Sequence, residues 1–243
     1  MPKFSRYTQQ IVAHAEDAFP EECCGVIYAG KYIRLVNVDP EPEENFSISI
    51  ADQDKYDNDP LTEAYVHSHP DGPVCPSVGD QKAQFSGTKP WVIVAHHKDY
   101  GWVHLEMGDH LLGEPLVGRP FCHAVFDCYS LVQAWFWQVK EIKLGNFVRQ
   151  EDWWDKGENL YADNFEQMGF VELKGHSLSE ALPGDCFLFK IDFKVEQHGL
   201  VYVGDGKVLH HLPNQLSRED AAEFWAGRAS RWLRHKSLMQ GHE

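Results

Sequence analysis

The stretch HSHPDGPVCPSVGD, residues 67–80, carries two histidines one residue apart, a proline-broken loop, and a serine three residues before an aspartate. Together with the preceding residues, this stretch gives the run TEAYVHSH, residues 62–69, which predicts a strand that ends at His69. In a strand, residues i and i+2 face the same way, so His67 and His69 are expected side by side. Ser77 has the position of a helix N-cap, which places Asp80 in the first helical turn. Two imidazoles and one carboxylate commonly hold catalytic zinc with a fourth position left for water. The stretch therefore predicts a zinc site, and a histidine-rich loop with an ordinary capping box is the plain alternative.

A zinc-bound water also needs a general base that is not itself a metal ligand. A glutamate at the edge of an adjacent strand would serve this purpose. The segment PEECCG offers Glu21 and Glu22 just before a predicted strand. Strand geometry alone does not choose between them.

The complete pattern, a glutamate followed by HxHP and then Ser-x-x-Asp, resembles the JAMM (MPN-type) metalloprotease motif over about residues 1–106. The family's glutamate directly precedes its Cys-Gly strand, and this favours Glu22 as the base. The resemblance implies that His67, His69 and Asp80 ligate zinc. It further implies that Ser77 helps to stabilise the oxyanion.

Bulk composition excludes several classes of protein. The chain has 243 residues, 43% of them hydrophobic, which suits one large domain or two small ones. A net charge of −15 with no basic run makes nucleic-acid binding unexpected. No apolar run approaches the ~20 residues that span a bilayer, and the first ten residues lack the apolar core of a signal peptide. Most of the six cysteines are expected to be buried small hydrophobes rather than a disulfide framework.

The order of predicted elements indicates two α+β domains. A helix over residues 5–18, two strands joined at a glycine turn, the TEAYVHSH strand, a helix from SVGDQKAQF and two further strands make up residues 1–107. Residues 108–120 combine three glycines with two prolines and are expected to be a linker. Residues 121–243 form the second domain.

The second domain begins with the helix DCYSLVQAWFWQV, whose predicted apolar face consists of Leu131, Val132, Trp135, Phe136 and Val139. Strands are expected at DCFLFKI and HGLVYV, and a hairpin through GDG joins the latter to KVLHHL. The charged and aromatic tail beyond Ser217 predicts a short helix and a strand.

Cys128 follows Asp127 at the start of this helix. Asp127 can act as the N-cap, and a cysteine in the first turn is where the helix macrodipole stabilises a thiolate. A nucleophilic cysteine needs a histidine base and an orienting partner, and His198 with His210 would provide them. A three-residue GDG loop places these histidines on one strand face, whereas a two-residue loop places His210 on the other. His211 therefore remains a rival, and a buried cysteine beside a polar hairpin is the plain alternative.

The segments FDCYSLV, ALPGDCFLF and HGLVYVGDGKVLHHL resemble the NlpC-type papain-like cell-wall peptidases over about residues 116–215. The resemblance implies Cys128 as nucleophile and His198 as base. The family's third polar residue comes about twelve positions later, and this selects His210. One departure is Tyr129, because a small residue often follows the family's cysteine. The larger side chain is expected to narrow the cleft or to alter the choice of substrate.

Both modules in this order resemble the lambda-type phage tail tip assembly protein K family, from residue 1 to about 215. The resemblance implies a mixed-sheet zinc domain and a papain-like domain, with Zn²⁺ as cofactor and phage tail tip proteins as partners. The cysteine site would cut peptidoglycan stem peptides beside the D-γ-glutamyl link to diaminopimelate, and the zinc site a peptide or isopeptide bond.

The expected location is the host cytoplasm during assembly, with the virion tail tip as a second location. The main alternative is an assembly factor of the tail tip that uses catalytically latent hydrolase folds. A ubiquitin-type deconjugating enzyme would suit the first module, but the cell-wall-peptidase module argues against it.

Overall fold

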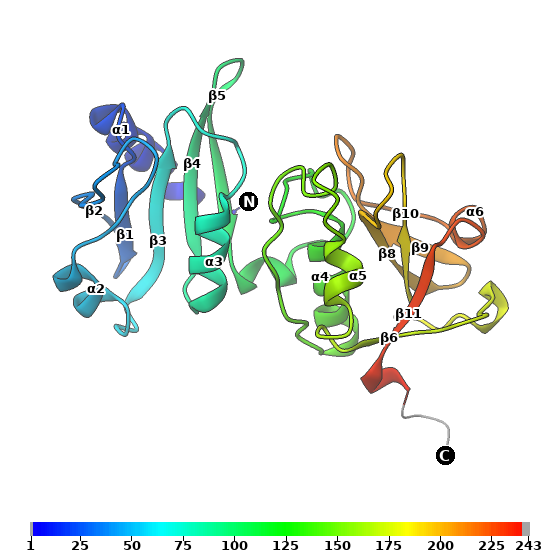
Figure 1. The fold of residues 1–243 in the computed structure, drawn as a ribbon. Helices are drawn as coiled ribbons and strands as arrows, with labels where there is room; N and C mark the ends of the chain where they lie inside the picture. The colour runs from blue at the N-terminus through cyan, green and yellow to red at the C-terminus, as the bar shows by residue number, and fades with distance from the viewer. Residues whose placement is uncertain (1, 240–243) are drawn as a thin grey trace. The chain divides into compact units, whose positions relative to one another are not determined.

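The computed structural model describes residues 2–239, and the chain divides into two compact units between Leu111 and Leu112. Each unit combines a sheet with helices, so the α+β fold class is confirmed (Figure 1). The division falls inside the expected linker, residues 108–120. That segment also holds a short 3-10 helix, η2 (Asp109–Gly113).

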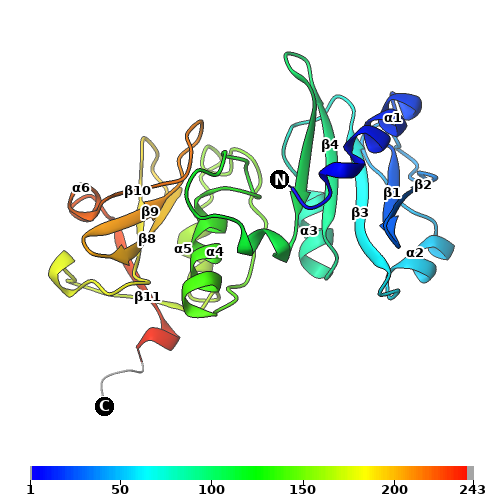
Figure 2. The ribbon, with the colours of Figure 1, turned by 180° about the vertical axis from the view of Figure 1, so that it is seen from behind.

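The first unit is built on a five-stranded mixed sheet with the order β2-β1-β3-β4-β5. Strands β3 and β4 run parallel, and the other neighbours are antiparallel. Helices α1 and α3 lie on opposite faces of the sheet (Figures 1 and 2). The elements are η1 (Ser5–Tyr7), α1 (Thr8–Ala18), β1 (Cys24–Tyr28), β2 (Lys31–Leu35), α2 (Ile50–Tyr56), β3 (Thr62–His69), α3 (Val78–Ser86), β4 (Trp91–His97) and β5 (Gly101–Met107).

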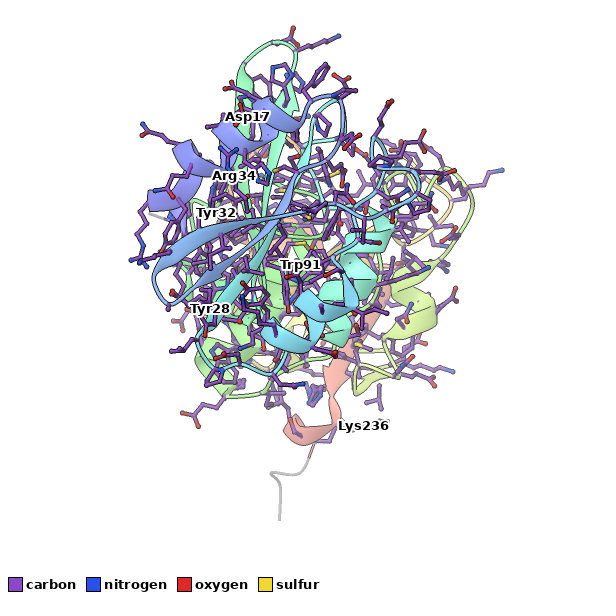
Figure 3. The ribbon with its side chains drawn as sticks, turned by 90° about the vertical axis from the view of Figure 1, so that its left-hand side faces the viewer. Asp17, Tyr28, Tyr32, Arg34, Trp91 and Lys236 are labelled. Carbon is purple, nitrogen blue, oxygen red and sulfur yellow. The ribbon has the colours of Figure 1, made fainter. Side chains whose placement is uncertain are left out.

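Apolar spacing explains how α1 attaches to this sheet. Ile11 and Ala15 recur at helical spacing and are fully buried against the central strands. The run of β4 from Val92 to Ala95 is buried on both faces, as its continuous apolar sequence predicts. At the exposed edge, Arg34 of β2 pairs with Asp17 of α1 at 2.7 Å, and Figure 3 labels both residues.

Glu106 ties the N-terminal segment to β5. Its carboxylate accepts hydrogen bonds from the backbone amides of Lys3 and Phe4, at 3.2 and 2.7 Å. The rings of His104 and His110 lie at 2.9 Å from its two oxygens. Burial raises the pKa of Glu106, but the bonds from both histidines and Phe4 outweigh burial and lower it to about 2.

We expect Glu106→Gln to lower the free energy of unfolding at neutral pH by about 2 kcal/mol, because the lowered pKa reflects a carboxylate favoured by the folded state. A carboxylate whose pKa is lowered in the folded state stabilises the fold at any pH above its ordinary pKa. For Glu106 this contribution is lost as the pH falls through about 2. The difference between variant and wild type should therefore shrink below about pH 4.5. Chemical denaturation across this range checks the result, with the exposed Glu41→Gln as control. Equal stability of Glu106→Gln and wild type at neutral pH would show that the Glu106 carboxylate does not stabilise the fold.

The second unit is built on a six-stranded antiparallel sheet with the order β10-β9-β8-β7-β11-β6. Helix α4 packs on β8 (Figure 1). The elements are α4 (Cys128–Lys140), α5 (Leu160–Asn164), β6 (Phe170–Glu172), η3 (Leu178–Glu180), β7 (Cys186–Phe189), β8 (His198–Gly204), β9 (Lys207–His210), β10 (Arg218–Ala221), α6 (Ala222–Ala226), β11 (Arg231–His235) and η4 (Lys236–Leu238).

Alternation along the strands gives this sheet two apolar faces. Cys186 and Val201 belong to the core under α4, whereas Phe187 and Leu200 belong to the core on the side of α6. The predicted apolar face of α4 is correct for four of its five residues. Val139 was expected there but is exposed, because the helix ends one residue later and its last turn extends beyond the core.

The hairpin between β8 and β9 combines a two-residue turn with a bulge. Asp205 and Gly206 both have positive φ, as a type I′ turn requires. The register then shifts between Tyr202 and Gly204, so that Val201 pairs with Leu209. The shift restores the alignment that a three-residue loop would give. His198 and His210 consequently share one face of the sheet.

Candidate active sites

His67, His69 and Asp80 form a compact triangle of ligand atoms in the first unit. The Nε2 atoms of the two histidines are 3.1 Å apart. They lie 3.1 and 3.2 Å from the two carboxylate oxygens of Asp80. Ligands held tetrahedrally at about 2.1 Å from a zinc ion would be roughly 3.4 Å apart. All three side chains are buried, and their separations fit a small cation with little adjustment.

Neighbouring groups hold these three side chains in place. The Nδ1 atom of His69 lies 3.0 Å from the carbonyl of Pro73, which suits a proton on Nδ1 and leaves Nε2 free to ligate. His67 stacks on Phe46 at a centroid distance of 4.3 Å. Burial raises the pKa of Asp80, but the two histidines outweigh burial and hold it well below its usual range.

Ser77 and Asp80 form the capping box that starts α3. The amide of Ser77 donates to Asp80 Oδ2 at 2.7 Å, and the amide of Asp80 donates to Ser77 Oγ at 3.0 Å. The predicted N-cap is therefore confirmed. The box also fixes the orientation of the carboxylate.

Glu22 lies at the same cleft, immediately before β1. It is only 7% exposed and lines the cleft together with His69, Ser77 and Asp80, whereas Glu21 is exposed. Burial raises the pKa of Glu22 to about 7, against the opposing influence of His69. A carboxyl group of this kind can both accept and return a proton near neutral pH.

In the second unit, Cys128 begins α4 directly after its cap. Asp127 accepts a hydrogen bond from the amide of Ser130 at 2.9 Å, so the predicted N-cap is confirmed. A cleft of about 240 Å³ opens here and is lined by Cys128 and His198. The sulfur of Cys128 lies 3.0 Å from the hydroxyl of Tyr161.

The expected stabilised thiolate is not what this environment favours. Burial raises the pKa of Cys128 to about 11, and the neighbouring Asp127 carboxylate acts in the same direction. Burial likewise lowers the pKa of His198 to about 3, with His210 and His211 adding to the effect. The resting pair is therefore a neutral thiol and a neutral imidazole, because desolvation outweighs the helix dipole.

His198 begins β8 and packs against His210, with a centroid distance of 5.6 Å. Among the described residues, Nε2 of His198 has no hydrogen-bond partner. The Nε2 atom of His210 lies 2.9 Å from Asp220. His211 is also buried, but its ring packs on Phe121 instead. The structure thus brings His210, rather than His211, against His198.

A buried ion pair fixes the start of α4. The Nε atom of Arg149 donates to Asp127 Oδ2 at 2.7 Å, and both side chains are almost completely buried. Arg149 also donates to the carbonyls of Ala124 and Phe147. Burial raises the pKa of Asp127, but Arg149 outweighs it and lowers the pKa to about 2.

Sequence reasoning missed Arg149, Tyr161 and Asp220. Arg149 and Tyr161 lie between α4 and β6, where no motif marks them. Asp220 lies in a strand that the tail pattern did not predict. A buried acidic N-cap at Asp127 was the one signal that could have suggested a cationic partner.

Comparisons with known proteins match both units separately and the chain as a whole. Residues 4–107 match prokaryotic homologs of the JAB domain, and residues 118–234 match the NlpC/P60 family. Tail tip assembly protein K of Escherichia phage lambda is 38% identical over 176 residues, which are 72% of this chain and 82% of that protein. Tail tip assembly protein K of Escherichia phage N15 is 32% identical over 243 residues, covering 96% and 95%. NlpC1 from Trichomonas vaginalis is 18% identical, with coverage of 52% of this chain and 42% of that chain and a TM-score of 0.37.

Proposed function

The chain belongs to the tail tip assembly protein K family, and we propose that it acts in phage tail tip assembly as a hydrolase with two peptidase sites. The observation that carries this proposal is the presence of two complete side-chain sets, one in each unit. The proposed partners are phage tail tip proteins and the peptide stem of peptidoglycan. Among residues 2–239, no helix is long and apolar enough to cross a membrane.

In the first unit, His67, His69 and Asp80 would hold Zn²⁺. When bound, the ion would supply Lewis-acid polarisation of the scissile carbonyl. Glu22 would accept the proton of the attacking water and return it to the leaving amine. The hydroxyl of Ser77 would donate to the developing oxyanion. The bond cut would be a peptide or isopeptide bond.

We expect the full chain to bind one equivalent of zinc, and His69→Ala to weaken zinc binding by at least about 100-fold, because even outer-shell changes cost 10- to 100-fold. Competition with a chromogenic chelator measures the affinity. His97→Ala, at the end of β4 and outside the triangle, is the matched control and should bind normally. Equal affinity of wild type and His69→Ala would exclude this site.

In the second unit, Cys128 would pass its proton to His198 as the sulfur attacks the carbonyl. The resulting imidazolium would give the proton to the leaving amine, and water would release the acyl group from the sulfur. His210 would orient His198. We place the scissile bond between D-γ-glutamate and diaminopimelate of the stem peptide.

Digestion of diaminopimelate-type peptidoglycan tests the assignment of this bond. The full chain is used untreated, alkylated with iodoacetamide, or stripped of metal by a chelator, and released muropeptides are identified by mass spectrometry. We expect products from the untreated and stripped protein and none after alkylation. If the products disappear after metal removal but not after alkylation, the cleavage of peptidoglycan would be assigned to the first unit.

A second candidate function is an assembly factor with latent sites. It is favoured by the burial of Cys128, which is 5% exposed, and by its raised pKa. This candidate expects no products from folded wild-type protein under any of the three treatments.

A further inference from the structure

We propose that Tyr161 is a positioning residue of the cysteine site, whose phenol donates a hydrogen bond to the Cys128 sulfur and holds the thiolate in the cleft. This inference rests on the proposed role of Cys128 as nucleophile. The two atoms are 3.0 Å apart, and both side chains are buried and line the same cleft.

Two groups from different elements favour a negative charge on the Cys128 sulfur. The backbone amide of Gly199, next to His198, and the hydroxyl of Tyr161 both act against burial to lower the pKa of Cys128. The pKa of Tyr161 is itself raised well above its usual value by burial, so the phenol stays protonated and can donate a hydrogen bond to the sulfur. When the thiol proton passes to His198, the negative sulfur can therefore keep the hydrogen bond from Tyr161.

Packing fixes where this phenol points. The residue before α5, Asn159, accepts a hydrogen bond from the backbone amide of Glu196 at 3.1 Å, two residues before β8. The Tyr161 ring packs edge-on against Trp153 at a centroid distance of 5.3 Å. Figures 1 and 2 both show α5 beside α4. These contacts hold the Tyr161 hydroxyl in place relative to α4, which carries Cys128, and β8, which carries His198.

A simpler role for Tyr161 is also testable. A buried phenol needs a partner, and the sulfur could serve only as the nearest acceptor. Removing a merely structural hydroxyl changes stability but leaves the thiol pKa where it was. Removing a positioning hydroxyl raises the thiol pKa.

The experiment is the pH dependence of Cys128 alkylation by iodoacetamide in the full chain, followed by mass spectrometry of the labelled peptide. We expect Tyr161→Phe to raise the apparent pKa of Cys128 by about one unit, which makes alkylation near neutral pH roughly tenfold slower. Tyr202→Phe is the matched control. The Tyr202 hydroxyl accepts a hydrogen bond from the amide of Gly206 at 3.2 Å and does not line the cleft, so its removal should leave the Cys128 pKa unchanged.

An unchanged pKa in folded Tyr161→Phe overturns the inference. If that variant does not fold, 3-fluorotyrosine at position 161 should lower the thiol pKa instead, because its more acidic phenol donates more strongly. Hydrolysis of the stem peptide is measured in parallel. Absence of hydrolysis by wild type counts against the proposed function, whereas hydrolysis with an unshifted pKa counts only against the role of Tyr161.

Discussion

Replacing Cys128 with alanine is expected to slow hydrolysis of the D-γ-glutamyl–diaminopimelate bond by at least about 10⁴-fold, because removal of a nucleophile leaves only binding and oxyanion stabilisation. The sulfur lies at the start of α4 in the cleft that His198 also lines. Among the residues described, no other cysteine lines this cleft. The measurement is the initial rate of cleavage of a synthetic stem peptide.

Cys186→Ala is the matched control for this prediction. Cys186 is buried in the same unit, and its thiol lies 3.7 Å from the carbonyl of Gly184, away from the cleft. The folded control should cleave the peptide within about twofold of the wild-type rate, since the Cys186 thiol does not line the cleft where the reacting atoms lie. A Cys128→Ala protein that cleaves at the wild-type rate would remove Cys128 from the mechanism.

Replacing Arg149 with methionine is expected to lower the free energy of unfolding by about 3–5 kcal/mol, because it leaves the Asp127 carboxylate buried without its cation. Arg149 is fully buried, and its pair with Asp127 is 2.7 Å long. Chemical denaturation of the full chain, followed by tryptophan fluorescence, measures the loss. Adding Asp127→Asn should recover part of it, since asparagine carries no charge.

Lys207→Met provides the comparison with an exposed ion pair. Lys207 lies 3.0 Å from Glu219, and more than a third of each side chain is exposed. Pairs of this kind contribute about 0–1 kcal/mol, so the control should be close to wild type. A loss for Arg149→Met no larger than that of Lys207→Met would show that the buried pair does not stabilise the start of α4.

The triangle of His67, His69 and Asp80 was predictable from the sequence because its contacts are local. His67 and His69 are two residues apart on β3, and strand periodicity alone puts their rings on one face. Asp80 follows from the capping box with Ser77. The position of Glu22 was not predictable in this way, because β1 must pair with β3 before Glu22 and Glu21 can be distinguished.

At the cysteine site, local sequence patterns did not predict the hairpin register or the thiol pKa. The two-residue turn at Asp205 and Gly206 was one of the alternatives, and by itself it would turn His210 away from His198. The bulge after Tyr202 reverses that consequence. Gly204, which has positive φ at the register shift, is a residue type found in bulges, but a glycine here suits a turn equally well and did not distinguish the two. The raised pKa of the Cys128 thiol was not predicted either, because it too depends on contacts between distant segments. Helix position favours a thiolate, but the burial of Cys128 depends on packing with Tyr161 from a distant segment.

Plaque formation by phage carrying substitutions in this chain tests most directly whether this tail tip assembly protein works as an enzyme. We predict that Cys128→Ala reduces the plaque titre severely while Cys186→Ala does not, with both proteins folded by thermal unfolding. Normal titres from both Cys128→Ala and Glu22→Ala phage would contradict the claim and leave the two sites as latent parts of an assembly factor.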